Sequence, residues 1–179
     1  ALRASRVCGF TICPPRGAHL SQAELRHGLE TVLALGVPLA IYQLPQVTQN
    51  EMSAELIADL AGQHSNFILF KDSSGSDRVA LHDNGRSGVF LVRGAEGDYA
   101  PWLRQAGGPY HGLLLSTANC LAAPLHRTVE LLEAGEIEAA QALSARLTGA
   151  VRAIFEQVQS VPWGNAFTNA NKAMDHFVA

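Results

Sequence analysis

The sequence predicts an α/β protein in which a parallel sheet is covered by helices. Short apolar runs of strand length alternate with segments whose apolar residues recur at helical spacing. This alternation is typical of βαβ units, which place successive strands side by side and parallel. At 179 residues the chain is long enough to bury a sizeable core.

Five apolar runs are predicted to be strands. They are Val7–Cys13, Val37–Tyr42, Phe67–Lys71, Val89–Val92 and Gly112–Ser116. Proline or glycine follows each of the first four within a few residues, as expected where a strand ends in a turn.

Helices are predicted between and after these strands. Ser21 and Glu24 have the spacing of a capping box, and the helix that they begin ends near Gly36. Ser53 is the expected N-cap of a second helix. Further helical segments are predicted at Tyr99–Gln105, at Pro124–Gln159 with an interruption at Gly135, and around Ala170, Met174 and Phe177.

The element pattern alone leaves the architecture of the sheet open. Length favours a five-stranded doubly wound sheet, because a complete (β/α)8 barrel usually needs about 250 residues. However, the glycine-rich phosphate loop that often follows the first strand of such sheets is missing, since neither GxGxxG nor GxxxxGK occurs.

Composition excludes several classes of partner. The formal charge of −3 does not indicate binding to nucleic acid or to an anionic membrane, and no apolar run approaches the length of a membrane span. An odd number of cysteines in apolar stretches, expected to be buried thiols, favours a reducing, cytoplasmic location. The histidines are scattered, and His126 with Glu130 lacks further ligands, so no metal site is predicted.

Lys71 is the strongest candidate for a reactive group. Of the thirteen basic residues only Lys71 and Lys172 are lysines. Lys71 ends an apolar strand, where low-dielectric surroundings disfavour the ammonium form and make the amine nucleophilic near neutrality. The alternative is a strand-end lysine paired with Asp72 or a nearby carboxylate. Tyr42 ends the preceding strand, within reach of Lys71, and its phenol could relay protons.

These motifs, taken in order, resemble the dihydrodipicolinate synthase/N-acetylneuraminate lyase family. The matching residues are Tyr42-x-x-Pro45, Phe70-Lys71-Asp72-Ser73-Ser74-Gly75, Gly94 after an apolar strand, and Gly112 with Ser116-Thr117-Ala118-Asn119. The resemblance implies a partial (β/α)8 TIM barrel, strands four to eight, followed by a C-terminal helical segment. Residues 1–134 would form the barrel part and residues 135–179 the helical region.

The resemblance also implies roles for particular residues. Lys71 would form a Schiff base with pyruvate or a related 2-keto acid, and Tyr42 would shuttle the proton. The expected substrate-binding residues are Gly94, Leu115, Ser116 and Thr117. No cofactor is implied. A homo-oligomer, tetramer or dimer, is expected, as is a longer protein of which this chain is a part.

Some positions depart from the pattern of dihydrodipicolinate synthases. Val47 stands where those enzymes have an arginine, Gln49 stands where they have a glycine, and Pro14-Pro15-Arg16 replaces a turn that carries a tyrosine. Arg16 or Arg93 could offer a substitute charge to a substrate carboxylate, although a rim or salt-bridge arginine is the alternative for each.

These departures argue against dihydrodipicolinate synthesis and leave open aldolases of 2-keto-3-deoxy sugar acids, hydroxy-oxoglutarate-type aldolases and sialic-acid-like lyases. An aldolase or lyase of the 2-keto-3-deoxy sugar acid type is the expectation. A sugar-acid dehydratase on the same scaffold and a non-catalytic relative that binds a keto acid remain as alternatives.

Overall fold

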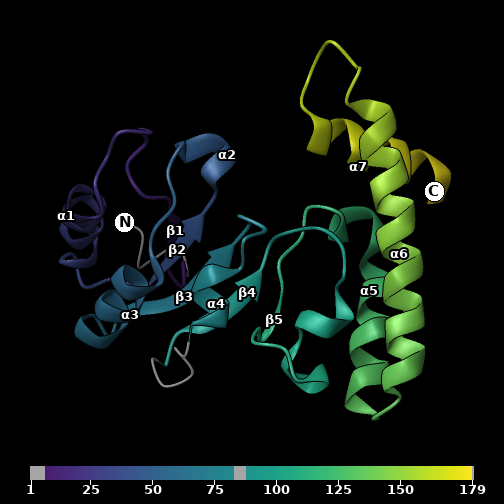
Figure 1. Cartoon of the computed structure of the whole chain (residues 1–179), viewed down its shortest axis with the longest axis horizontal. Coiled ribbons are helices and arrows are strands. Elements are labelled where there is room, and N and C mark those ends of the chain that lie inside the picture. The colour runs from purple at the N-terminus through teal and green to yellow at the C-terminus, as the bar shows by residue number, and fades with distance from the viewer. Residues whose placement is uncertain (1–6, 83–87, 179) are drawn as a thin grey trace. The chain divides into compact units, whose positions relative to one another are not determined.

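The structure is a computed structural model that describes residues 7–82 and 88–178. The chain forms two compact units. The first, called the sheet unit, comprises Ala1–Arg93 and Pro109–His111, and the second, called the helical unit, comprises Gly94–Gly108 and Gly112–Ala179. In Figure 1 strands β1 to β4 belong to the sheet unit and the long helices α5 and α6 to the helical unit.

Four parallel strands form the sheet of the sheet unit among the described residues. They are β1 (Phe10–Ile12), β2 (Leu39–Gln43), β3 (Phe67–Asp72) and β4 (Phe90–Arg93), and each pairs with the next in chain order. Consecutive parallel strands need a crossover between them, and helices supply it, as predicted. The α/β fold with a parallel sheet is therefore confirmed. Its assignment to strands four to eight of a barrel stays a prediction.

The helices of the sheet unit begin where the sequence places caps. Helix α1 (Gln22–Leu33) is preceded by Ser21, which forms the predicted capping box with Glu24. Helix α3 (Ala54–Gln63) is capped by Ser53, whose side chain accepts from the backbone N–H of Leu56. Two one-turn helices, α2 (Pro45–Thr48) and α4 (Arg78–Leu81), complete the unit.

The apolar core of the sheet unit joins one face of the sheet to these helices. Buried strand residues are Leu39, Ile41, Phe67, Phe70 and Leu91; buried helix residues are Leu25, Leu29, Leu33, Leu56, Ile57 and Leu60. Side chains alternate between faces along a strand. The same buried face therefore carries Gln43, Asp72 and Arg93 at the carboxyl ends of β2, β3 and β4.

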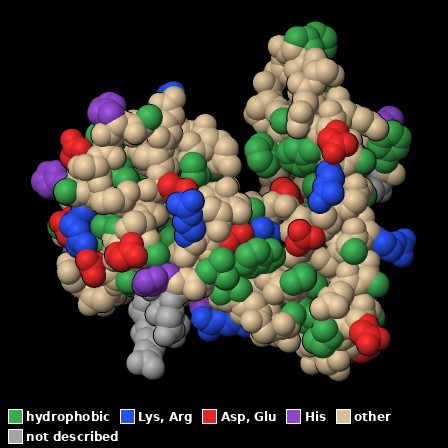
Figure 2. All heavy atoms as spheres, in the orientation of Figure 1, with side chains coloured by type: hydrophobic (Ala, Val, Ile, Leu, Met, Phe, Trp, Pro, Cys, Tyr) green, Lys and Arg blue, Asp and Glu red, His purple; other side chains and the backbone are tan. Residues whose placement is uncertain are grey.

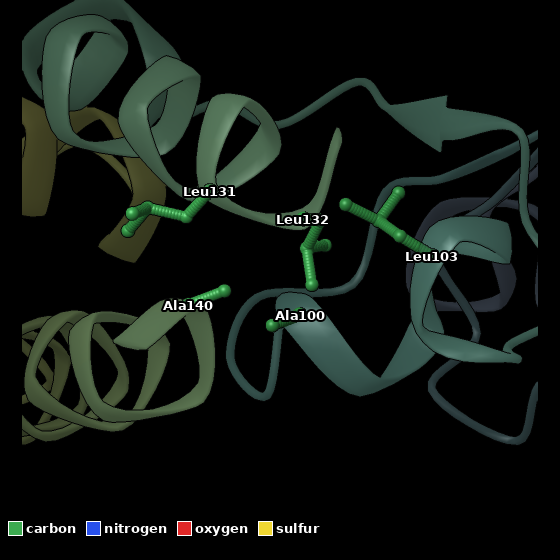
Figure 3. Packing of buried hydrophobic residues seen from close by; sticks show 5 residues of the cluster. All are labelled: Ala100, Leu103, Leu131, Leu132 and Ala140. Atoms are coloured by element: carbon green, nitrogen blue, oxygen red, sulfur yellow. The ribbon is translucent and has the colours of Figure 1, made fainter. Parts of the chain in front are cut away.

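The helical unit contains three long helices. They are α5 (Ala118–Glu133), α6 (Ile137–Val158) and α7 (Ala166–Val178), and α5 and α6 run side by side (Figure 1). Leu131 and Leu132 of α5, with Ala140 of α6, pack against Ala100 and Leu103 (Figure 3). A second cluster joins Tyr99, Leu115, Leu125 and Leu147, so the segments 99–103 and 115 are fixed onto the helix pair.

Two predicted elements of the helical unit differ from the structure in type or length. The segment Tyr99–Gln105 forms two 3-10 turns, η2 (Ala100–Trp102) and η3 (Arg104–Ala106), instead of one helix. The strand predicted at Gly112–Ser116 is only β5 (Gly112–Leu113). Pro101 accounts for part of the first difference, because proline favours the first turn of a helix over its interior.

Helix α5 begins at Ala118 instead of Pro124. Its backbone departs from helical geometry at Leu121, with φ −113° and ψ 27°. Proline cannot donate to the carbonyl four residues earlier, and its ring crowds that turn, so the kink lies where the helix must accommodate Pro124. The predicted start therefore marks a real interruption within a longer helix.

Candidate active site

The amine of Lys71 lies against the ring of Tyr42 in the sheet unit. Lys71 in β3 and Tyr42 in β2 are direct register partners. Lys71 Nζ is 4.1 Å from the centroid of the Tyr42 ring, and both side chains are half-buried. The face of an aromatic ring attracts a cation, so the ring holds the amine at this point. The two residues proposed from the sequence are thus brought together at the carboxyl ends of neighbouring strands.

Ser73 holds the phenol of this pair. Its hydroxyl Oγ donates to Tyr42 Oη at 3.2 Å. Its backbone N–H donates to the carbonyl of Gln43 at 3.0 Å, and its carbonyl accepts from Gln46 Nε2 at 3.2 Å. In the sequence Ser73 belongs to the motif around Lys71, but no role was predicted for its side chain. Residues two apart in extended chain face the same side, so the spacing from Lys71 to Ser73 was the signal that could have identified it.

Cys13 lies within electrostatic reach of Lys71. Although the residue as a whole is exposed, partial burial of the Cys13 thiol raises its pKa, and the positive charge of Lys71 opposes that rise. The expectation of buried thiols was wrong, because Cys8 and Cys13 are exposed and Cys120 is half-buried. Among the described strands β1 pairs with β2 alone, so β1 lies at an edge of the sheet. Cys8 and Cys13 flank this edge strand, and the apolar residues next to them in the sequence do not cover their side chains.

Arg93 is held by a buried carboxylate. Arg93 Nε donates to Asp77 Oδ1 at 3.0 Å and Nη2 donates to Oδ2 at 3.1 Å, and the two side chains are 7% and 2% exposed. Tyr110 Oη donates to the same carboxylate at 2.6 Å. Burial raises the pKa of Tyr110, and the charges of Asp72 and Asp77 raise it further. Of the two roles considered for Arg93, this geometry supports the salt bridge.

Two departures from the expected motif lie on the surface, one within α2 and one at its C-cap. Val47 is 56% exposed, so the position offers an apolar side chain to solvent. Gln49 adopts φ 63° at the C-cap of α2, a left-handed conformation that suits glycine. The backbone at position 49 therefore has the left-handed conformation that favours the glycine of the family motif, although the residue here is glutamine. Arg16 is also exposed.

Glu96 organises the predicted substrate-binding segment of the helical unit. Its Oε1 accepts from Ser116 Oγ and from the Thr117 backbone N–H, both at 3.1 Å. Its Oε2 accepts from Thr117 Oγ1 at 2.6 Å and from Tyr99 Oη at 3.1 Å. One carboxylate thus joins the turn that follows Gly94 to the N-terminus of α5. The sequence analysis missed Glu96, because two of its partners lie about twenty residues further along the chain.

The predicted substrate-binding residues of the helical unit differ in what their side chains contact. Leu115 is buried in the apolar cluster with Tyr99, whereas Ser116 is half-buried and bonded to Glu96. Thr117 is fully buried. Gly94 directly follows β4. The side chains of Leu115 and Thr117 are therefore engaged in the protein's own packing, and the substrate-binding role of all these residues stays a prediction.

Clusters of metal-ligating side chains and membrane-spanning helices are absent from the described residues. Within 7–82 and 88–178 no group of three or more His, Cys, Asp or Glu side chains is placed to hold a metal ion. No helix in these ranges combines the length and apolar content that crossing a membrane requires. On the face shown in Figure 2, basic and acidic side chains are interspersed.

Comparison with known protein families gives one extensive match. The model of the dihydrodipicolinate synthetase family matches residues 3–168. A 4-hydroxy-tetrahydrodipicolinate synthase from Azoarcus sp. (strain BH72) is 27% identical over 164 residues, which cover 90% of this chain and 55% of that protein. Another from Xanthomonas axonopodis pv. citri (strain 306) is 32% identical over 130 residues, 72% of this chain and 42% of that protein. The chain thus spans about half the length of these relatives.

Solved structures agree on the fold. A 2-keto-3-deoxygluconate aldolase from Picrophilus torridus superposes with a TM-score of 0.73 at 20% identity, over 93% of this chain and 58% of that one. A doubly substituted variant of the Sulfolobus solfataricus 2-keto-3-deoxygluconate aldolase gives 0.72 at 14% identity, over 96% and 55%. At these identities the likeness concerns the fold alone.

Proposed function

The chain belongs to the dihydrodipicolinate synthetase family, and on this premise we propose that it carries the reactive lysine of a Schiff-base lyase or aldolase acting on pyruvate or another 2-keto acid. The observation that carries the proposal is the Lys71 amine, 4.1 Å from the Tyr42 ring at the carboxyl ends of β3 and β2. Parallel α/β sheets place their reactive groups at that edge.

The proposed reaction begins at the nitrogen of Lys71. As a neutral amine it attacks the ketone carbon of the keto acid, and the ketone oxygen leaves as water with the two amine hydrogens. The imine nitrogen then takes up one proton from solvent, which gives the protonated imine. When the bond between C3 and C4 breaks, its electron pair moves into the imine and gives an enamine, while the C4 hydroxyl loses its proton and becomes an aldehyde. Protonation of the enamine at C3 and addition of water then release pyruvate and the free amine.

Tyr42 is the proposed proton carrier for these steps. Its ring contacts the amine, and its phenol oxygen accepts a hydrogen bond from Ser73. A phenol in this place can take the proton of the C4 hydroxyl and return one to the enamine carbon. Ser73 fixes the direction of the phenol, because its own backbone is bonded to Gln43 and Gln46.

The proposed second substrate is a 2-keto-3-deoxy sugar acid. Val47 stands where dihydrodipicolinate synthases are expected to have an arginine, and its exposed side chain carries no charge. The likeness in fold to 2-keto-3-deoxygluconate aldolases is compatible with this class. We further propose a homo-oligomer, tetramer or dimer, that works in the cytoplasm without a cofactor.

Product analysis of the complete protein tests this function. It is incubated with 2-keto-3-deoxy sugar acids, and the release of pyruvate and the formation of dehydrated product are measured separately. The proposal expects pyruvate release that Lys71→Arg abolishes, whereas Lys172→Arg, the change of the exposed second lysine, leaves it unaltered. Dehydrated product without pyruvate identifies the dehydratase instead. Absence of any Lys71-dependent product indicates a non-catalytic relative.

A further inference from the structure

The carboxyl group of Asp72 lies directly behind Lys71 on the buried face of the sheet. Asp72 is 0% exposed. Its Oδ1 accepts from the backbone N–H of Ser74 at 2.8 Å and from Ser74 Oγ at 2.6 Å. Its Oδ2 has no hydrogen-bond partner among the described residues. Burial of a carboxyl group costs free energy, and hydrogen bonds offset only part of that cost when one oxygen has no partner. The burial of Asp72 therefore calls for a structural role, and its bonds to Ser74 indicate where that role lies.

The bonds of Asp72 extend into a chain of hydroxyl groups that fixes the turn after β3. Ser74 Oγ and Ser76 Oγ lie 2.9 Å apart, and the Ser76 backbone N–H donates to Ser74 Oγ at 3.2 Å. Ser76 Oγ in turn donates to Glu51 Oε1, just before α3. The turn Ser73–Ser76 is thereby attached to the buried face of the sheet and to the segment that precedes α3.

The same turn carries the hydroxyl that holds Tyr42. Ser73 lies between Asp72 and Ser74, and its Oγ donates to Tyr42 Oη on the face that carries Lys71. One turn is therefore held from both faces, by Asp72 on one and by Ser73 with Tyr42 on the other. A loss of the Asp72 bonds would free Ser74. The adjacent Ser73 would then be left with only its backbone bonds to Gln43 and Gln46, and its hydroxyl would no longer keep a defined position.

We propose that Asp72 is a positioning residue for the reaction proposed above, since its Oδ1 fixes the turn that keeps the Ser73 hydroxyl on the Tyr42 phenol. The inference rests on the proposed function, because the phenol matters only if it serves the Lys71 amine. The role belongs to an acceptor oxygen and not to a charge. Asparagine at position 72 therefore preserves the position of the turn, whereas alanine does not.

Hydrogen exchange of the complete protein tests the structural step independently of activity. The backbone N–H of Ser74 is bonded to Asp72, and that of Ser73 to the carbonyl of Gln43. Asp72→Ala is expected to accelerate exchange of both amides at least tenfold, and Asp72→Asn to leave them near the wild-type rate. Unchanged exchange rates of these two amides in Asp72→Ala overturn the inference, independently of any result on activity. If that variant does not fold, Ser74→Ala removes the hydroxyl alone and is expected to accelerate exchange in the same peptide.

Kinetics test the consequence for the reaction. Removal of the Ser73 hydroxyl in Ser73→Ala is expected to lower kcat about fivefold, the effect of one hydrogen bond, with KM little changed. In the Asp72→Ala background the same change is expected to have no further effect, because Ser73 is already displaced. Asp59→Asn, at an exposed carboxylate, is the control and keeps wild-type kcat.

The outcomes separate the two proposals. A Ser73→Ala effect of the same size in both backgrounds contradicts the positioning role of Asp72, and so does a kcat of Asp72→Ala equal to that of wild type. Wild-type protein that forms no product and no Lys71 adduct contradicts the proposed function instead. In that case exchange at Ser73 and Ser74 still decides whether Asp72 fixes the turn.

Discussion

Removal of either partner of the buried pair Arg93–Asp77 should destabilise the sheet unit strongly. Their side chains are 7% and 2% exposed, and two N–H groups of Arg93 bond the carboxylate at 3.0 and 3.1 Å. Arg93→Ala leaves the Asp77 carboxylate buried without its positive partner, although the Tyr110 hydroxyl still donates to it. Breaking a buried pair in this way costs about 3–5 kcal/mol, because one charge stays out of water uncompensated.

The double variant distinguishes a coupled pair from two independent contacts. In Arg93→Met with Asp77→Asn both charges are absent, so the loss should be smaller than the sum of the losses in Arg93→Met alone and Asp77→Asn alone by about 1–3 kcal/mol. The free energy of unfolding is measured in urea, with the slope m compared among variants to confirm that the denatured state is unchanged.

An exposed pair of similar chemistry provides the control. Arg26 Nη2 and Asp59 Oδ2 are 2.6 Å apart, closer than the buried pair, but their side chains are 29% and 57% exposed. Arg26→Ala should therefore change stability by only about 0–1 kcal/mol. The reasoning is refuted if Arg93→Ala loses no more than Arg26→Ala, or if the double variant loses the full sum of the single ones.

Three single-residue properties give further predictions. Tyr42→Phe should lower kcat by about 10²–10⁴ at nearly constant KM, because the ring stays against Lys71 while the proton carrier is lost; a fall below tenfold argues against that role. Burial first, then the charges of Asp77 and Glu51, raises the pKa of Asp72 in the folded state. The neutral carboxyl of Asp72 therefore contributes fully to the free energy of unfolding at pH values below its pKa in the unfolded chain. This contribution is lost as the pH rises through its pKa in the folded protein. Urea unfolding from acid to neutral pH should show wild type losing stability relative to Asp72→Asn, and a constant difference contradicts the raised pKa. Gln49→Gly should raise the unfolding free energy by up to about 1 kcal/mol, since φ 63° strains glutamine, and a destabilised variant would show that the exposed side chain contributes more than the strain.

Local signals in the sequence predicted the parts of the fold that depend on neighbouring residues. Ser21 with Glu24 and Ser53 mark helix starts, since capping involves residues three apart. The pairing of Tyr42 with Lys71 was also predictable, because both end apolar strands and parallel strands align their carboxyl ends. Periodicity and turn residues were sufficient for these features.

The sequence could not predict contacts between residues that only the fold brings together. Asp77 bonds Arg93 and Tyr110, which lie 16 and 33 residues away, and no local pattern links these residues. Glu96 bonds Ser116 and Thr117 across a similar separation. The strand after Gly112 is short because Leu115 turns into the apolar cluster of the helix pair, a contact that hydrophobicity alone does not distinguish from strand burial.

Reductive trapping of the lysine adduct tests the central claim most directly. The complete protein is treated with pyruvate and borohydride, digested, and the peptides that contain Lys71 and Lys172 are analysed by mass spectrometry. The Schiff-base account predicts N-(1-carboxyethyl)lysine at Lys71, dependent on both reagents and missing from Lys71→Arg. Modification confined to Lys172, or an unmodified Lys71 under conditions that saturate the enzyme with pyruvate, would contradict it.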